Sequence, residues 1–315
     1  MGMDEYKKMV DDIIGEVRKA VIGKDDVLKK VIVTIIAKGH ILIEDYPGLA
    51  KTLMARSFSN ALGCNFKRIQ FTPDLLPMDI LGSFIFNRER MDFKFLEGPI
   101  FTNILLADEI NRAPPKTQSA LLEAMQEYQV TLEGETRKLE MPFIVIATQN
   151  PIEFEGTYPL PEAQLDRFLV RISVGYPSRE AEVAMLESRK KLNMDYLQVN
   201  NVITKDKLLE IQDNAEKIHV DSSIEEYIVE LVTRTRKNEQ VEVGSSPRGT
   251  LALFKLSRAM ALANGRDFVI PDDVKSVAKM ALSHRIILKP EPWIRGVKPE
   301  DIIEKILSST PVPKI

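Results

Sequence analysis

Five short runs of apolar, mostly β-branched residues restrict the fold of this 315-residue chain more than any other feature. The runs are 40–44, 67–71, 103–107, 143–148 and 169–174. Turn or helix signals bound each run, and segments with helical spacing, such as 51–62 and 115–128, separate several of them. Strands that alternate with helices predict an α/β fold, a parallel sheet with helices on both faces and ligand sites at the carboxyl ends of its strands.

Two segments interrupt this alternation, and both predict β-hairpins. Residues 83–96 surround a charged turn at 87–90, and residues 129–141 surround Glu133-Gly134-Glu135. Surface hairpins without a special role remain an alternative for both. After residue 176 the apolar runs nearly cease and helical patterns cover the chain, so we expect an α/β domain at 1–176 and a helical domain at 177–315.

Composition excludes several classes of protein. The formal net charge of -3 predicts no strong attraction to nucleic acid over the whole chain. The single cysteine, Cys64, excludes an intramolecular disulfide and a multi-cysteine zinc site, and the three histidines are too dispersed for a metal cluster. No apolar run approaches the roughly 20 residues of a membrane-spanning helix. We therefore expect a cytoplasmic protein without a membrane segment.

The segment from Asp45 to Thr52, DYPGLAKT, follows the first predicted strand and opens a predicted helix. A phosphate-binding loop needs inward backbone N–H groups, a helix N-terminus, a lysine and a hydroxyl for magnesium. Lys51 and Thr52 supply the last two, whereas Asp45 and Ala50 stand where the usual pattern has glycines. By itself the segment fits a phosphate-binding loop and an ordinary strand-to-helix turn equally well.

Asp108 and Glu109 follow the third run, within NILLADEINRAPPKTQSALLEAMQ. Asp108 at the strand tip can hold the shell of a magnesium ion, and Glu109 is placed to polarise a water for attack on a γ-phosphate. Two acids after a strand also occur as a capped turn. Because these acids follow Lys51 by about two strand–helix units, they suit a second strand of the same sheet. The two motifs together predict an ATP site.

Three further polar residues are candidates to complete this site. Asn150 leaves the tip of the fourth run, where it would orient water, although Asn150-Pro151 also fits the start of a turn. Arg167 ends a predicted short helix, and Arg248 begins a later one. Arginine is always charged and forks onto phosphate oxygens, which suits phosphoryl transfer. For Arg167 taken alone, a structural salt bridge is the commoner explanation.

Residues 40–177 closely resemble the MoxR family of AAA+ ATPases, in HILIEDYPGLAKT, EGPIFTNILLADEINRAPPKTQSALLEAMQE, ATQNP and GTYPLPEAQLDRF. With the helical part included, the resemblance covers nearly the whole chain. It implies a five-stranded P-loop sheet sandwiched by helices and followed by a smaller helical lid. It also implies that ATP and Mg²⁺ bind between the domain and the lid and against the next subunit. The two hairpins correspond to the family's helix-2 insert and to its hairpin before sensor 1.

The resemblance assigns roles residue by residue. Lys51 and Thr52 correspond to the end of Walker A, and Asp108 and Glu109 to the Walker B acids, with Thr52 and Asp108 as the metal ligands. Asn150 corresponds to sensor 1, Arg167 to the arginine finger offered to a neighbouring subunit, and Arg248 to sensor 2. Glu109, Asn150 and Arg167 are the implied catalytic residues. The implied nucleotide contacts are Ile22, Gly48, Leu49, Ala50, Lys51, Thr52, Leu53, Asp108 and Arg248.

The resemblance further implies a chaperone-like machine that hydrolyses ATP as a ring, with a hexamer expected, and remodels or helps assemble a partner protein. MoxR relatives often act beside proteins with von Willebrand factor A domains. This chain contains no such domain, so that partner would be a separate chain.

Two other functions fit parts of the sequence. A nucleic-acid-stimulated motor would want basic or aromatic hairpin tips, and Arg88 and Arg90 are its best support, whereas Glu133 and Glu135 are acidic. A nucleotide-sensing scaffold with little turnover would be expected to lack some catalytic residues, yet all of the candidate catalytic residues are present. We therefore expect a protein client and no nucleic acid.

Overall fold

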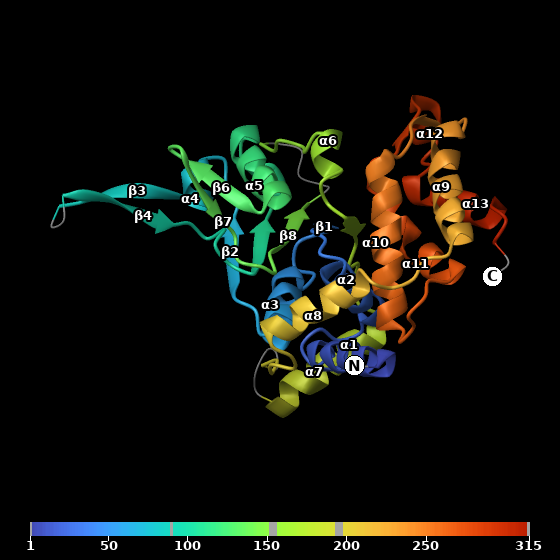
Figure 1. The fold of residues 1–315 in the computed structure, drawn as a ribbon, viewed down its shortest axis with the longest axis horizontal. Helices are drawn as coiled ribbons and strands as arrows, with labels where there is room; N and C mark the ends of the chain where they lie inside the picture. The colour runs from blue at the N-terminus through green and yellow to red at the C-terminus, as the bar shows by residue number, and fades with distance from the viewer. Residues whose placement is uncertain (1, 89–90, 151–155, 193–197, 314–315) are drawn as a thin grey trace.

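The computed structural model describes residues 2–88, 91–150, 156–192 and 198–313, and the sheet at its centre confirms the predicted fold class (Figure 1). The five strands of this sheet are β1 (Ile41–Glu44), β2 (Phe66–Gln70), β5 (Ile104–Asp108), β8 (Ile144–Gln149) and β9 (Val170–Ile172). They are all parallel and lie in the order β2-β5-β8-β1-β9. Each strand begins and ends within about two residues of the run that predicts it.

Alternate residues of the central strands face two hydrophobic cores, one on each side of the sheet. In β5, Ile104 and Leu106 belong to one core, and Leu105 and Ala107 belong to the other. Because both faces are covered, such strands are continuous apolar runs and do not alternate with polar residues. The register pairs Ala107 with Ala147, so β5 and β8 end side by side and bring the polar residues that follow them together.

Helices from the first half of the chain help to form the cores on both faces of this sheet. They are α1 (Met3–Arg18), α2 (Asp25–Ile36), α3 (Lys51–Ala61) and α5 (Pro115–Glu127). The first three contribute to one core, and α5 contributes to the other. Helix α1 buries a stripe with the spacing of one helix face, which explains why its pattern predicts a helix. This stripe consists of Tyr6, Val10, Ile13, Ile14 and Val17.

Both predicted hairpins form. Strands β3 (Gly82–Asn87) and β4 (Asp92–Glu97) follow α4 (Pro77–Leu81) and pair antiparallel, as do β6 (Gln129–Leu132) and β7 (Glu135–Lys138). The β3–β4 hairpin extends far from the body of the molecule (Figure 1). Glu89 and Arg90 of its predicted turn lie outside the described residues.

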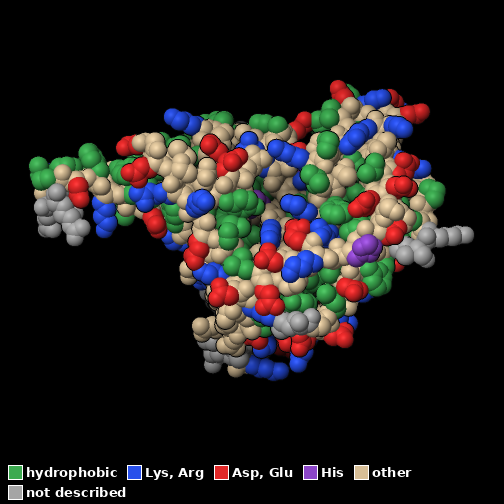
Figure 2. Space-filling model, in the orientation of Figure 1, with side chains coloured by type: hydrophobic (Ala, Val, Ile, Leu, Met, Phe, Trp, Pro, Cys, Tyr) green, Lys and Arg blue, Asp and Glu red, His purple; other side chains and the backbone are tan. Residues whose placement is uncertain are grey.

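The β3–β4 hairpin carries apolar side chains into solvent. Two cross-strand aromatic pairs, Phe84 with Phe95 and Phe86 with Phe93, have ring centroids 5.3 Å apart and share one face. Arg137 of β7 covers the inner part of this face, 4.3 Å from the centroid of Phe95. The outer part is bare, and hydrophobic side chains follow the hairpin almost to its tip (Figure 2). Its exposed apolar residues are Ile85, Phe86, Met91, Phe93 and Leu96.

The second half of the chain is helical, as predicted. It contains α7 (Arg179–Leu192), α8 (Lys205–Ala215), α9 (Ser222–Lys237), α10 (Pro247–Ala263) and α11 (Pro271–Leu282). The sequence patterns miss a two-stranded sheet and two final helices. These are β10 (Val241–Val243), β11 (Ile287–Leu288), α12 (Pro290–Ile294) and α13 (Pro299–Ser309). Strands of two or three residues are too short to show a period of two.

Helix α8 and the residues before it lie against the first domain. The amides of Val202 and Ile203 both donate to the carbonyl of Ala61, and the Gln212 side chain donates to the carbonyl of Ile35 at 2.8 Å. One hydrophobic core runs from α1 to α13. A domain division at residue 176 therefore remains a proposal. In the described part of the chain, no helix is long and apolar enough to cross a membrane.

Candidate functional site

The loop between β1 and α3 adopts the shape that a phosphate-binding loop needs. Gly48 and Ala50 both have positive φ, of 82° and 55°, and Ala50 directly precedes the first turn of α3. A left-handed alanine costs about 1 kcal/mol because its Cβ approaches the next carbonyl, so the fold holds this turn against local strain. The strained turn brings the loop to the N-terminus of α3, where backbone N–H groups favour an anion.

The side chain of Lys51 folds back over this loop, and its ammonium group contacts the loop backbone. Its Nζ donates to the carbonyl oxygen of Asp45 at 2.7 Å. Burial lowers the pKa of Lys51 from its ordinary value, and the negative charges of Asp45, Asp108 and Glu109 oppose that shift. A phosphate would replace a single neutral acceptor with charged oxygens, so Lys51 is poised to turn from the loop towards an anion.

The two acids at the end of β5 share one hydroxyl. Thr148, in β8, donates from Oγ1 to Oδ1 of Asp108 at 2.5 Å, and the amide of Glu109 donates to the same Oγ1 at 2.9 Å. Glu109 has a φ of 58°, so the backbone reverses at this residue and η1 (Ile110–Arg112) begins. Thr148 thus fixes both Walker B acids, a role that the sequence patterns did not identify.

Strand β2 contributes two further residues that the sequence patterns missed. Arg68 donates to Oδ2 of Asp108 from Nε at 3.1 Å and from Nη2 at 2.7 Å. Gln70 donates to Oε2 of Glu109 at 2.6 Å, and Nε of Arg112 lies 3.1 Å from the same oxygen. These donors hold both carboxylates in place. A cation bound through Oδ2 of Asp108 would compete with Arg68 for that oxygen.

These elements enclose a cavity of about 440 Å³ at the carboxyl edge of the sheet. It is lined by Pro47, Gly48, Leu49, Ala50, Lys51, Thr52, Leu53, Arg68, Gln70, Asp108, Glu109 and Asn150. The structure therefore brings Asn150 together with the two motifs, while the adjacent Pro151 lies outside the described residues. Neither Ile22 nor any described residue beyond 176 lines this cavity.

Arg167 and Arg248 lie together at a different place. Both line a second cavity of about 330 Å³, next to α6 (Glu162–Leu165) and α10. Nη1 of Arg248 lies 3.7 Å from Oδ2 of Asp166, the residue before Arg167. Nε of Arg167 has no hydrogen-bond partner among the described residues. Two cations are thus grouped away from the Walker residues of their own chain.

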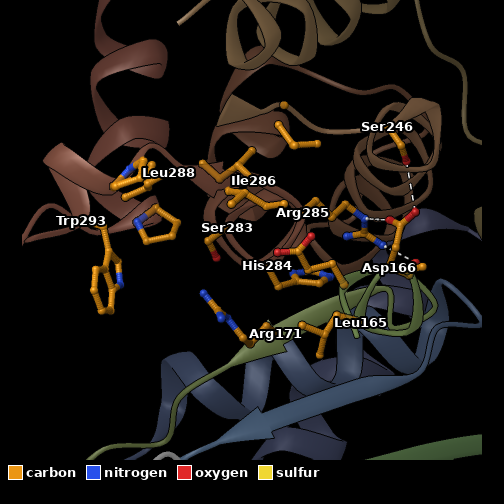
Figure 3. Close-up of a pocket in the computed structure, with 17 residues that line it drawn as sticks. Leu165, Asp166, Arg171, Ser246, Ser283, His284, Arg285, Ile286, Leu288 and Trp293 are labelled. Carbon is orange, nitrogen blue, oxygen red and sulfur yellow. Dashed lines mark hydrogen bonds and ion pairs between the residues drawn. The ribbon is translucent and has the colours of Figure 1, made fainter. Parts of the chain in front are cut away.

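Asp166 joins this arginine pair to the lid. Its Oδ1 accepts from Nε of Arg285 at 2.7 Å, and its Oδ2 accepts from Oγ of Ser246 at 3.1 Å (Figure 3). A cavity of about 810 Å³ lies on this side of the molecule between α6 and the β11–α12 segment, with Trp293 at its edge. Its lining is mostly apolar, and none of the Walker residues contributes to it.

Two family models match separate parts of the chain. Residues 40–170 match the model described as "ATPase family associated with various cellular activities (AAA)", and residues 233–306 match the model described as "AAA lid domain". The first match contains β1, β2, β5 and β8, ends at the first residue of β9, and includes Lys51, Asp108 and Glu109. The second spans α10 to most of α13, including Arg248.

Individual proteins match over nearly the whole chain. The uncharacterised protein YeaC of Bacillus subtilis is 46% identical over 98% of this chain and 97% of its own length. Chaperone MoxR1 of Mycobacterium tuberculosis is 43% identical over 96% of this chain and 82% of its own length. A crystal structure from Cytophaga hutchinsonii, assigned as an ATPase, superposes with a TM-score of 0.91 at 43% identity and covers 99% of this chain and 97% of that one.

Proposed function

Because this chain belongs to the MoxR family of AAA+ ATPases, we propose that it binds ATP with Mg²⁺ at the P-loop and hydrolyses the γ-phosphate. The observation that carries this proposal is the convergence of Lys51, Thr52, Asp108, Glu109 and Asn150 on one cavity. In this proposal Lys51 meets the phosphates, Glu109 polarises the attacking water and Asn150 orients it.

The residues at this cavity suit Mg²⁺. Thr52 offers a hydroxyl and Asp108 a carboxylate, and Mg²⁺ takes oxygen ligands of this kind while keeping several waters. The metal would neutralise charge that develops on the phosphate oxygens. We propose that Thr52 and Asp108 hold it, with Arg68 giving up its contact to Asp108.

The lysine of the loop provides a direct test. Lys51→Ala should weaken ATP binding by at least about tenfold, because it removes the charge-assisted contact with the ground-state phosphates. Equilibrium titration with a fluorescent ATP analogue measures this affinity. Lys116→Ala, on the exposed side of α5, is the matched control and should bind as the wild type does. Equal affinity in the wild type and Lys51→Ala would contradict the assignment of the loop.

The position of Arg167 and Arg248 supports assembly into a ring. Neither arginine lines the Walker cavity of its own chain, yet both line one cavity with each other. We propose that the pair serves the ATP of a neighbouring subunit, where the forked guanidinium groups stabilise charge in the transition state. Arg248 then contributes to the nucleotide site in trans. A closed ring, with six subunits expected, provides one such contact at every interface.

We propose that this machine remodels a partner protein in the cytoplasm, with a protein carrying a von Willebrand factor A domain as one candidate. The exposed apolar residues of the β3–β4 hairpin support a protein client, because apolar surface of this kind associates with apolar surface. The turn of the other hairpin carries Glu133 and Glu135, which would repel a phosphate backbone.

The response to nucleic acid distinguishes the proposed protein-remodelling ATPase from a nucleic-acid-stimulated motor. We expect single- and double-stranded DNA and RNA to leave the ATPase rate within about twofold at physiological salt, since phosphate binding requires clustered Lys and Arg. Fluorescence anisotropy and a coupled ATPase assay measure binding and rate. Tight, salt-sensitive binding with several-fold stimulation would overturn the protein-client proposal and favour the motor.

A further inference from the structure

Residues 173–176 connect β9 to α7 and are held from both sides by charged groups. On one side, Oδ2 of Asp45 accepts from the hydroxyl of Ser173 at 3.0 Å and from the amides of Val174 and Gly175 at 2.6 Å each. On the other side, Nζ of Lys24 donates to the carbonyls of Val174, Gly175 and Tyr176 at 2.7 to 2.8 Å. The side chains of Asp45 and Lys24 thus bond to backbone amides and carbonyls that a neighbouring strand would otherwise pair with.

Asp45 is ionised in this arrangement. Its side chain is only 5% exposed, and burial alone would raise the pKa of the carboxyl group. The hydrogen bonds from Gly175, Tyr46, Ser173 and Val174 outweigh that burial, so the pKa of Asp45 lies below its ordinary value. Hydrogen bonds to a charged acceptor are stronger than neutral ones, which makes this grip on the segment tight.

Asp45 is also the first residue of the P-loop. Its backbone carbonyl accepts the hydrogen bond from Lys51, and its neighbour Tyr46 stacks on Tyr176 with ring centroids 5.9 Å apart. A phosphate that draws Lys51 away removes the contact on the carbonyl of Asp45. Asp45 would therefore lose a hydrogen bond at the P-loop, and the same residue binds the segment that leaves the sheet.

We infer that Asp45 is a positioning residue that couples occupancy of the P-loop to residues 173–176 and so to the chain beyond them. This inference rests on the proposed binding of ATP at the P-loop. It also explains why an aspartate stands where the usual phosphate-binding pattern has a glycine: the side chain is needed for a contact that glycine lacks. Lys24 anchors the opposite edge of the segment and does not touch the loop residues in these contacts.

The test is amide hydrogen exchange at residues 174 and 175, measured in the full-length protein with and without ATP and Mg²⁺. In the wild type, saturating ATP should change the exchange of both amides several-fold. In Asp45→Asn the amides should exchange at least about tenfold faster, because the charged acceptor is lost. The decisive expectation is that exchange in this variant no longer responds to ATP, even at ATP concentrations that saturate the variant's own measured binding.

A purely structural role for Asp45 gives a different result, in which exchange is faster but the response to ATP persists. That result would overturn the inference, as would a wild type whose two amides ignore ATP. Lys24→Met is the matched control, since it loosens the same segment from the carbonyl side and should keep the response. If Asp45→Asn does not fold, Ser173→Ala removes one of the three donors and should weaken the response by about half or more.

ATP binding is measured separately in the wild type and in each variant. This measurement distinguishes a failure of the proposed function from a failure of the inference about Asp45. A wild type that binds no ATP at all would overturn the proposed function and this inference together. A wild type that binds ATP, combined with an unchanged response in Asp45→Asn and in Ser173→Ala, would overturn this inference alone.

Discussion

Glu109→Gln should lower the rate of ATP hydrolysis by about a hundredfold or more while ATP affinity stays within about threefold. The amide keeps the size and the backbone position of the carboxylate, so the P-loop and Asp108 still bind the nucleotide. It cannot accept a proton from the attacking water, and this function matters only in the transition state. Steady-state kcat and equilibrium binding of a fluorescent ATP analogue measure the two quantities.

The control for this change is Glu123→Gln, the same substitution on the exposed side of α5. It should leave both the rate and the affinity unchanged. Turnover near the wild-type rate in Glu109→Gln would exclude Glu109 as the group that polarises water. If the variant binds ATP and stalls as expected, it should also retain a client in a pull-down, which makes it the reagent of choice for identifying that client.

Arg167→Ala should reduce hydrolysis by about a hundredfold or more while leaving ATP binding intact, because an arginine finger stabilises charge that grows during transfer. The structure supports action on a neighbouring subunit, since Arg167 does not line its own Walker cavity. Arg167→Ala mixed with Lys51→Ala should therefore regain turnover. In random rings of equal parts, about one quarter of the interfaces combine an intact Lys51 with an intact Arg167.

Recovery towards about a quarter of the wild-type rate, at concentrations where rings form, is the expected result. Arg234→Ala, which loses a surface pair with Glu230 and a hydrogen bond to the carbonyl of Ser309, is the matched control and should hydrolyse ATP normally without mixing. Mixtures that stay inactive while sedimentation detects mixed rings would identify Arg167 as a structural cation of its own chain.

The sequence predicts the sheet well because its strands are buried on both faces. Their apolar runs are continuous and bounded by turns, so local pattern and final position agree. The helical half is predicted less completely. Strands β10 and β11 pair across more than 40 residues, and neither is long enough to show its own period.

The sequence predicts the site residues that belong to local motifs, but it does not predict the residues that neighbouring strands of the sheet contribute. Lys51, Asp108 and Glu109 belong to motifs whose spacing can be recognised, and they line one cavity. Thr148, Arg68 and Gln70 reach the same acids from neighbouring strands, and only the strand order and register reveal them. A polar residue at the carboxyl end of a buried strand is the one local signal that could have identified Thr148.

The position of Arg248 shows a second limit of sequence reasoning. The family resemblance implies a nucleotide bound between domain and lid with Arg248 as sensor 2, and this role stays a prediction, since Arg248 lies outside the cavity lined by Lys51 and Asp108. Asp166, next to Arg167, also bonds to Arg285 and Ser246 in the helical half of the chain. Contacts of this kind depend on residues about 80 or more positions apart, which local patterns do not encode.

The β3–β4 hairpin joins the body of the molecule at a closely packed point, so the hairpin could act as a lever. A Cβ atom on Gly98 would lie 2.2 Å from the carbonyl oxygen of Ile80, so the end of β4 lies directly against the backbone of α4. Strands of six residues extend about 20 Å, and a rotation of about 10° at this fulcrum would carry the tip by about 3 Å. The helix that follows Glu109 through η1 is α5, and Thr117 of α5 bonds to Leu75 just ahead of α4. If the proposed hydrolysis of ATP shifts α5, this connection would move the exposed phenylalanines of the hairpin by a distance comparable to the length of a hydrogen bond.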